Sequence, residues 1–272
     1  MERFRLGSTL ILASATVISC SAPVTDRPST TPARDDTVVT EMDTTTTSHP
    51  APDTRSDVLV FHRTEGFRHA SIEAGIAAVE RLGASGGYEV TATEDPGIFT
   101  NTGLESFAVI VFLNTTGDVL DMGQQSAMEA FIRSGRGFVG VHSAADTEYD
   151  WPWYGGLVGA YFERHPAPQS AIVDVVASHP VVEEVDRQFE RFDEWYDFRA
   201  RPGQGVTILA TVDESTYEGG TMGMEHPIVW AQEYDGGRSA YIGFGHTSES
   251  FEEPLVLTLL GNAIEWAGPE PS

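Results

Sequence analysis

The chain has 272 residues, and its 41 acidic and 16 basic side chains give a formal net charge of −25. This balance argues against a nucleic-acid partner, because binding to phosphates requires clustered lysine and arginine. The chain contains a single cysteine, Cys20, which excludes an intrachain disulfide.

The first 20 residues have the features of a secretory signal peptide. Arg3 and Arg5 precede a short apolar run at residues 10–13. The end of this segment resembles the lipobox of bacterial lipoproteins, in which the cysteine is acylated, so we expect lipidation at Cys20. The alternative is an ordinary signal peptide with an incidental cysteine. With the lipid, the protein would lie in the cell envelope, anchored to a bacterial membrane and facing the periplasm or the exterior, with no other membrane contact.

Residues 21–56 are rich in threonine and proline and poor in large apolar side chains. Such a segment cannot bury enough surface to offset the entropy lost on ordering, which predicts a disordered tether. The remaining segment, residues 57–268, is long enough for one sizeable core and is expected to form a single domain.

The first half of this domain alternates between strand and helix patterns. Short continuous apolar runs indicate buried strands, whereas apolar residues three and four positions apart indicate helices with one buried face. The expected elements are strands at 58–61, 88–92, 108–113 and 137–141, and helices at 71–82 and 122–132. Strands that alternate with helices predict a parallel sheet covered on both faces.

The second half contains mainly strand patterns. The expected elements are strands at 171–176, 206–210, 228–233 and 239–244, followed by a helix at 254–267. The last two strands flank Asp235-Gly236-Gly237-Arg238, a turn-type sequence, and therefore predict a hairpin. We expect an antiparallel extension after the parallel core.

The strand at 137–141 ends abruptly at His142, which is followed by small residues and then Asp146. Open α/β sheets bind ligands at the carboxyl ends of their strands, so this stretch predicts a functional site. His142 and His246 are the strongest candidates, because each follows an apolar strand and imidazole titrates near neutral pH. The other histidines of the domain are His62, His69, His165, His179 and His226.

Several motifs occur in the order typical of one known family: Phe67-Arg68-His69, Gly140-Val141-His142-Ser143, Trp151-Pro152-Trp153-Tyr154, His179-Pro180, Asp193-Glu194-Trp195-Tyr196, Met224-Glu225-His226-Pro227 and Gly243-Phe244-Gly245-His246. Together they resemble a ThuA-like domain of the trehalose-utilisation family, over essentially all of residues 57–267. The resemblance implies an α/β, flavodoxin-like fold similar to the class I glutamine amidotransferases, a three-layer sandwich with a mainly parallel sheet and an antiparallel extension. Glutamine amidotransferase activity is not expected, because the domain has no cysteine to serve as its nucleophile.

Two mechanisms suit a site rich in histidine. In the first, His142 and a partner among Asp146, Glu194 and His246 move protons on a sugar, one group acting as base and another as acid. In the second, three histidines and Asp146 or Glu194 bind a divalent metal, the one cofactor considered. The candidate metal ligands among the histidines are His69, His142, His226 and His246. The sequence lacks a His-Glu-x-x-His motif, so the metal stays the alternative.

A third mechanism would use Ser143 as the nucleophile, His246 as its base and Glu249 as the orienting carboxylate. The segment around Ser143 lacks the glycine pattern of a hydrolase elbow, which disfavours this mechanism.

A small carbohydrate is the expected substrate, because aromatic residues lie beside the polar motifs and flat rings suit the apolar faces of a pyranose. The expected substrate contacts are Arg68, His69, Trp151, Trp153, Tyr196 and His226. The resemblance implies breakdown of disaccharides through 3-keto intermediates, with a sugar oxidoreductase as partner. The protein would then be a hydrolase, lyase or isomerase of keto-glycosides. The alternative is a non-catalytic carbohydrate-binding surface lipoprotein.

Overall fold

The computed structural model of the chain describes residues 57–269. The predictions made for residues 1–20 and 21–56, including lipidation at Cys20, lie outside the described residues. None of the helices within 57–269 combines the length and the apolar character needed to cross a membrane.

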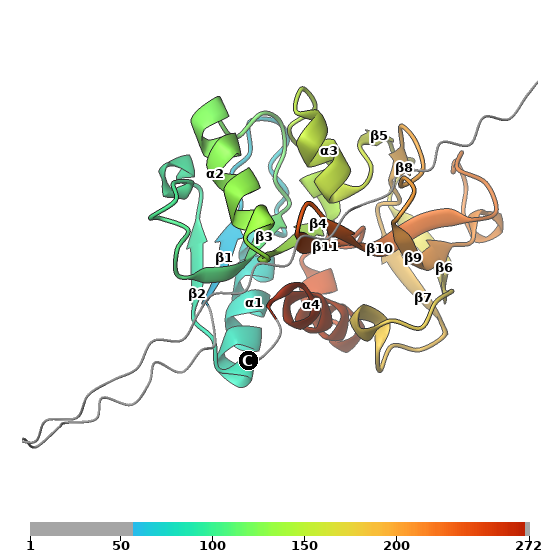
Figure 1. Cartoon of the computed structure of the whole chain (residues 1–272). Helices are drawn as coiled ribbons and strands as arrows, with labels where there is room; N and C mark the ends of the chain where they lie inside the picture. The colour runs from blue at the N-terminus through green and yellow to red at the C-terminus, as the bar shows by residue number, and fades with distance from the viewer. Residues whose placement is uncertain (1–56, 270–272) are drawn as a thin grey trace, which may run out of the picture. The chain divides into compact units, whose positions relative to one another are not determined.

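A nine-stranded sheet forms the centre of the domain, and its first five strands run parallel (Figure 1). In spatial order these strands are β2 (Val90–Thr93), β1 (Asp57–Phe61), β3 (Phe107–Leu113), β4 (Gly137–Val141) and β11 (Gly237–Ile242). Every residue of β3 and β4 is buried, as expected for parallel strands that are covered on both faces. β4, which His142 follows, lies between β3 and β11 within the parallel half.

The other four strands form the antiparallel extension that the sequence predicts. They are β10 (His226–Tyr234), β9 (Thr207–Val212), β6 (Gln169–Val175) and β7 (Gln188–Asp193). β10 and β11 make the expected hairpin, whose two-residue turn, Asp235 and Gly236, has positive φ at both positions. A separate two-stranded sheet pairs β5 (Phe162–Arg164) with β8 (Asp197–Phe198).

Helices cover both faces of the sheet and give the three-layer arrangement (Figure 1). α1 (Ile72–Gly86) and α4 (Pro254–Ala267) pack on one face, in a core with Val60, Val111 and Val139. α2 (Met122–Arg133) and α3 (Pro152–Val158) pack on the other face, in a core rich in aromatic side chains. Successive residues of the strands point to opposite faces, which is why the two cores alternate along β1 and β3.

Two helices differ from the sequence-based expectation. α1 was expected to end near Gly83, but it continues to Gly86 and is closed by Gly87, which has a φ of +76°. Gly83 is instead a close-packing position, since a Cβ there would lie 2.7 Å from a methyl group of Val90. The loop-like sequence around Trp153 forms α3, with Pro152 at its first turn, where proline is tolerated.

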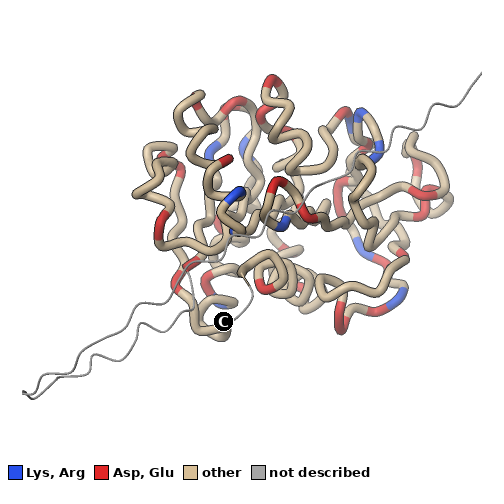
Figure 2. The backbone as a smooth tube through the Cα atoms, in the orientation of Figure 1, with Lys and Arg blue, Asp and Glu red and all other residues tan. Residues whose placement is uncertain are grey.

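The acidic side chains are spread over the elements of the described chain, and basic side chains are sparser (Figure 2). This distribution agrees with the overall negative charge of the chain.

Candidate functional site

His142 follows β4 in a strained backbone conformation, with a φ of +46°. This left-handed conformation carries a steric cost for a non-glycine residue, and such strain is concentrated at functional sites. The Tyr241 hydroxyl donates a hydrogen bond to the His142 carbonyl at 2.7 Å and helps to hold the turn. The imidazole is fully buried, and its Nδ1 lies 3.1 Å from the Gly243 carbonyl oxygen. Because a carbonyl can only accept, Nδ1 carries the proton and donates it.

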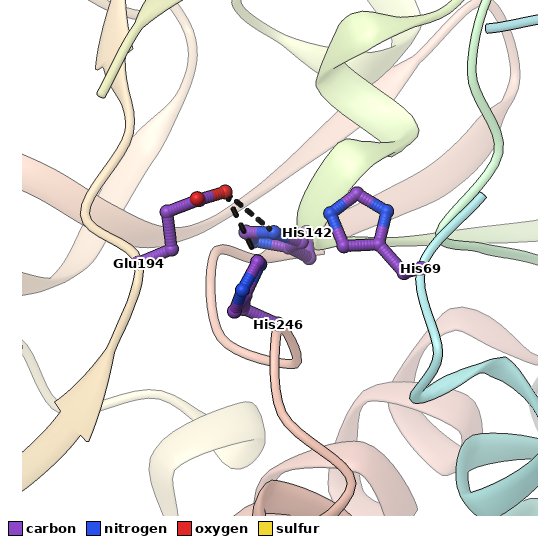
Figure 3. A group of neighbouring side chains, drawn as sticks. All are labelled: His69, His142, Glu194 and His246. Atoms are coloured by element: carbon purple, nitrogen blue, oxygen red, sulfur yellow. Dashed lines mark ion pairs between the residues drawn. The ribbon is translucent and has the colours of Figure 1, made fainter. Parts of the chain in front are cut away.

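Glu194 and His246 meet His142 from two other parts of the chain (Figure 3). Glu194 directly follows β7, and His246 lies four residues beyond β11. The Oε2 atom of Glu194 is 3.5 Å from His142 Nε2 and 3.2 Å from His246 Nδ1. The His246 side chain is one-quarter exposed, whereas that of Glu194 is 6% exposed, so solvent reaches the group from the His246 side.

His69, in the segment between β1 and α1, completes the group that we call the histidine cluster: His69, His142, Glu194 and His246. Its ring meets those of His142 and His246 edge-on, with centroid distances of 4.8 and 5.3 Å. One ligand atom from each of the four side chains lies within 4.8 Å of the other three. His69 Nδ1 is also 3.3 Å from the Ser143 hydroxyl.

Burial and mutual contact shift the pKa values of these groups. Burial, together with the neighbouring His142 and His246, lowers the pKa of His69 to about 3. Burial alone would raise the pKa of Glu194, but His142 and His246 outweigh it and hold that pKa well below its usual range. Glu194 in turn raises the pKa of His246 against the effect of burial. The cluster therefore favours an ionised carboxylate beside rings that differ in basicity.

The buried carboxylate of Asp193 holds the Glu194 and His246 backbones together. Its Oδ1 accepts hydrogen bonds from the backbone N–H groups of Glu194 at 2.8 Å and His246 at 3.1 Å. Its Oδ2 accepts from the Gly245 N–H at 3.1 Å and from Arg191 at 2.8 Å. Sequence reasoning placed Asp193 in a motif but gave it no role.

The carbonyl of Gly245, in the loop that carries His246, is held by two further hydrogen bonds. The Ser71 hydroxyl and the Asn114 side-chain amide donate to it at 2.8 and 2.9 Å. Asn114 also has a positive φ, of +50°, at the end of β3. The loop that carries His246 is thus anchored by β3, by the start of α1 and by Asp193.

His165 is a further neighbour of Glu194 that the sequence did not single out. Its Nδ1 lies 3.0 Å from Glu194 Oε1 and 2.9 Å from the Pro166 carbonyl oxygen, so it donates toward acceptors on both sides. The ring of Tyr196, an expected substrate contact, packs against His142 in a tilted arrangement, with centroids 4.2 Å apart. Tyr196 is itself buried, and it forms one wall of the cluster.

Asp146 lies on the same 3-10 turn as His142 but is not one of the four clustered residues. Its carboxylate accepts a hydrogen bond from the Tyr149 hydroxyl at 2.5 Å, and burial raises its pKa. Arg68, an expected substrate contact, forms ion pairs with Glu73 and Glu94 at 3.0 and 3.1 Å. Arg68 is 38% exposed, so it is accessible from solvent next to His69.

His226, expected as a substrate contact and metal candidate, lies in a different group, which we call the His226 cluster: Asp197, Glu214 and His226. Its Nε2 donates to the Tyr196 carbonyl at 2.8 Å. Its Nδ1 is 2.9 Å from Glu214 and 3.0 Å from the Tyr217 hydroxyl. Both ring nitrogens are therefore occupied by protein groups, and no lone pair is free for a ligand.

The structure does not bring the two expected sugar-binding tryptophans to the histidine cluster. Trp151 is buried and donates to Glu129 at 3.2 Å, and its ring stacks on that of Trp153. Trp153 donates to Asp235 at 2.7 Å, in the turn of the β10–β11 hairpin, and packs edge-on against Tyr234. Trp153 therefore serves the contact between α3 and this hairpin, and Trp151 the contact between α2 and Trp153.

The serine mechanism also finds no matching geometry. Ser143 is fully buried and has His69, not His246, as its histidine neighbour, and Glu249 is exposed to solvent. The three residues therefore do not form the chain of hydrogen bonds that a triad requires.

The comparisons with known proteins place this chain in a family. Residues 57–267 match the family model ThuA, described as trehalose utilisation. No curated protein matches the chain. A solved ThuA-like protein of Bacteroides uniformis is 24% identical, with a TM-score of 0.67 over 81% of this chain and 94% of that one.

A ThuA-like protein of Parabacteroides merdae is 19% identical, with a TM-score of 0.65 over 78% of this chain and 89% of that one. A cytoplasmic protein of Salmonella typhimurium, 11% identical, shares the fold with a TM-score of 0.57 over 79% of this chain and all of its own. The family match over most of the sequence shows that the chain belongs to the ThuA family, whose description, trehalose utilisation, indicates a carbohydrate-related role.

Proposed function

We propose that the protein is an enzyme of carbohydrate breakdown whose reaction takes place at the histidine cluster. The observation that carries the proposal is the convergence of His142, Glu194 and His246, with buried ring nitrogens directed at one carboxylate oxygen. Buried polar groups in a folded protein are normally satisfied, and exceptions are concentrated where a ligand binds or chemistry occurs.

A 3-keto-glycoside is the substrate class that suits such a site. A keto group acidifies the C–H bond of the neighbouring carbon, so a base can start elimination, hydrolysis or isomerisation without a strong nucleophile. The described part of the chain offers many imidazole and carboxylate groups, and Ser143, which contacts the cluster, is buried and lies against His69 and not against its expected base, His246. We propose that the cluster binds the keto oxygen and that Asp146 moves the proton.

Asp146 suits the proton-moving role for two reasons. It lies on the same turn as His142, and its carboxylate is oriented by the Tyr149 hydroxyl. Burial raises its pKa, which makes its ionised form a stronger base than an exposed aspartate. Asp146→Asn should lower kcat by about 100-fold or more with little change in KM, the range typical of a lost acid–base group.

NMR of the full chain mixed with a 3-keto-disaccharide, and separately with the unoxidised parent sugar, tests the proposal. We expect turnover of the keto sugar alone, and its loss in His142→Ala. The matched control is His179→Ala, because His179 caps a short turn through the Val181 N–H and packs against Trp266, away from the cluster. Absence of turnover by the folded wild-type chain would reject the proposal.

A non-catalytic carbohydrate-binding protein is the competing outcome of the same experiment. Line broadening of the sugar without turnover would support it. The expected sugar platform, Trp151 and Trp153, is engaged in internal packing, which favours the enzyme over the binding protein. The lipid anchor at Cys20 would place the reaction at the cell envelope beside a partner oxidoreductase, and a lipid-shifted mass of the Cys20 peptide tests that placement.

A further inference from the structure

We propose that His69, His142, Glu194 and His246 hold a divalent transition-metal ion. The binding site itself is argued from the geometry of the cluster alone. The catalytic role of the ion, polarising a sugar oxygen, rests on the proposed function.

Two ring nitrogens of the cluster lack the hydrogen bonds that buried nitrogens normally make, which favours a bound cation. His142 Nε2 and His246 Nδ1 are buried and have no hydrogen-bond partner among residues 57–269. His142 Nδ1 donates to the Gly243 carbonyl, so in the neutral ring Nε2 carries a lone pair. That lone pair faces Glu194 Oε2 at 3.5 Å. Two electron-rich atoms that face each other in a buried site need a cation between them, and a metal ion can take the place of the shared proton.

The spacing of the ligand atoms suits a metal ion. Metal–ligand bonds of 2.0–2.2 Å put neighbouring ligand atoms roughly 3.0 Å apart in a six-coordinate site and roughly 3.4 Å apart in a tetrahedral one. Glu194 Oε2 lies 3.2 Å from His246 Nδ1 and 3.5 Å from His142 Nε2, close to this range. The nitrogen of His69 is within 4.8 Å of the other ligand atoms, which a small side-chain movement or a wider coordination sphere accommodates.

Groups outside the cluster hold the proposed ligands in place. The Gly243 carbonyl fixes the tautomer of His142, and Ser143 contacts the Nδ1 of His69. His165 lies against Glu194 Oε1, the oxygen that faces away from His142 and His246. Ligating histidines generally make such a contact through their second nitrogen, and it orients the ring toward the metal.

The residue types select the class of metal. Three imidazoles and one carboxylate suit zinc, iron, nickel or manganese, whereas magnesium and calcium prefer sites made of oxygen atoms. A six-coordinate ion held by four side chains has two positions left, which two neighbouring oxygen atoms of a sugar can fill. A bound keto oxygen would then be polarised, and the negative charge that develops on it would be stabilised by the ion.

The test is a titration of the chelator-treated full chain with zinc, followed by calorimetry, and with cobalt, followed by its visible absorption. We expect one zinc ion per chain and a cobalt spectrum that zinc abolishes. Glu194→Gln keeps the size of the side chain and should weaken zinc binding by at least about 100-fold, as should His142→Ala. The matched controls are Glu249→Gln, an exposed carboxylate three residues beyond His246, and His179→Ala.

Two results would overturn the metal site: no stoichiometric binding by the wild-type chain, or binding that Glu194→Gln and His142→Ala leave unchanged. Circular dichroism of each variant separates lost ligands from lost folding. Zinc binding without turnover of any keto sugar would uphold the metal site and reject the proposed reaction. Turnover by chelator-treated protein that binds no zinc would reject the metal site and uphold the reaction.

Discussion

The histidine cluster and the His226 cluster contain the same residue types and differ in how their hydrogen bonds are satisfied. In the His226 cluster both nitrogens of the central ring have protein partners, at 2.8 to 3.0 Å. In the histidine cluster, His142 Nε2 and His246 Nδ1 make no hydrogen bond within the described residues, and their contacts with Glu194 Oε2 are longer, at 3.5 and 3.2 Å. Satisfied polar groups specify a fold, whereas unsatisfied ones reduce stability unless a ligand completes them. We therefore infer that the first group is structural and the second binds a ligand.

The two clusters are also connected through Tyr196. His226 donates to the carbonyl of Tyr196, and the ring of Tyr196 packs against His142. The His226 cluster thus fixes one wall of the histidine cluster. A structural histidine supports the site without offering a free nitrogen to it.

The largest expected effect is the loss of stability when His226, the structural histidine, is replaced. His226→Ala leaves the Tyr196 carbonyl and the Glu214 carboxylate without their partner in a buried site, and we expect it to lower the free energy of unfolding by about 3 kcal/mol or more. His142→Ala removes a buried ring whose Nδ1 donates to the Gly243 carbonyl but whose Nε2 makes no hydrogen bond, so we expect a smaller loss, of about 1–2 kcal/mol. Urea unfolding measures both, and equal losses would contradict the distinction.

Bound zinc should stabilise the fold through the histidine cluster and not through the His226 cluster. Zinc at 100 times its dissociation constant should raise the free energy of unfolding of the wild-type chain by about 2.7 kcal/mol, by mass action on the folded state. Glu194→Gln should lose this stabilisation, whereas Glu214→Gln should start from a lower stability and retain it. A thermal melt with and without zinc measures the difference. Equal stabilisation of both variants would place the ion elsewhere.

Asp193 supports both the histidine cluster and the stability of the fold. Asp193→Asn turns one acceptor oxygen into an N–H donor, which must face other donors such as the Gly245 or His246 N–H. We expect a loss of about 2 kcal/mol in the free energy of unfolding and 10- to 100-fold weaker zinc binding. Asp174→Asn is the control, because Asp174 makes a contact with Gln188 at the surface of β6 and β7. Unchanged zinc affinity in folded Asp193→Asn would remove its positioning role.

Much of the fold could be predicted from sequence, because its elements obey local rules. Parallel strands such as β3 and β4 are continuous apolar runs, and the bounds of β4 and α4 agree with the expectation. β7 was not predicted, because it is an edge strand with mostly polar residues and only two buried positions. α3 was not predicted, because its glycines and Pro152 suggest a loop while its packing against β10 and β11 stabilises a helix.

The site was predictable only in part for a related reason. His142 follows a buried strand, and this local pattern marks the ligand edge. Whether His226 or Glu194 joins it depends on how the antiparallel extension folds back on the sheet, and no local pattern records that. The sequence analysis named both His226 and His246 as candidate metal ligands, yet only His246 is brought to His142.

The smallest effect tests the strain at His142 directly. With a φ of +46°, His142→Gly should be more stable than His142→Ala by about 1 kcal/mol, because glycine adopts the left-handed region without a steric penalty. His226 lies in β10 with an extended backbone, so His226→Gly should instead be less stable than His226→Ala by about 0.5–1 kcal/mol. Urea unfolding of the four variants gives both differences. Opposite signs at the two positions would show that strain is stored where the ligand binds and absent where the histidine is structural, and equal signs would refute this.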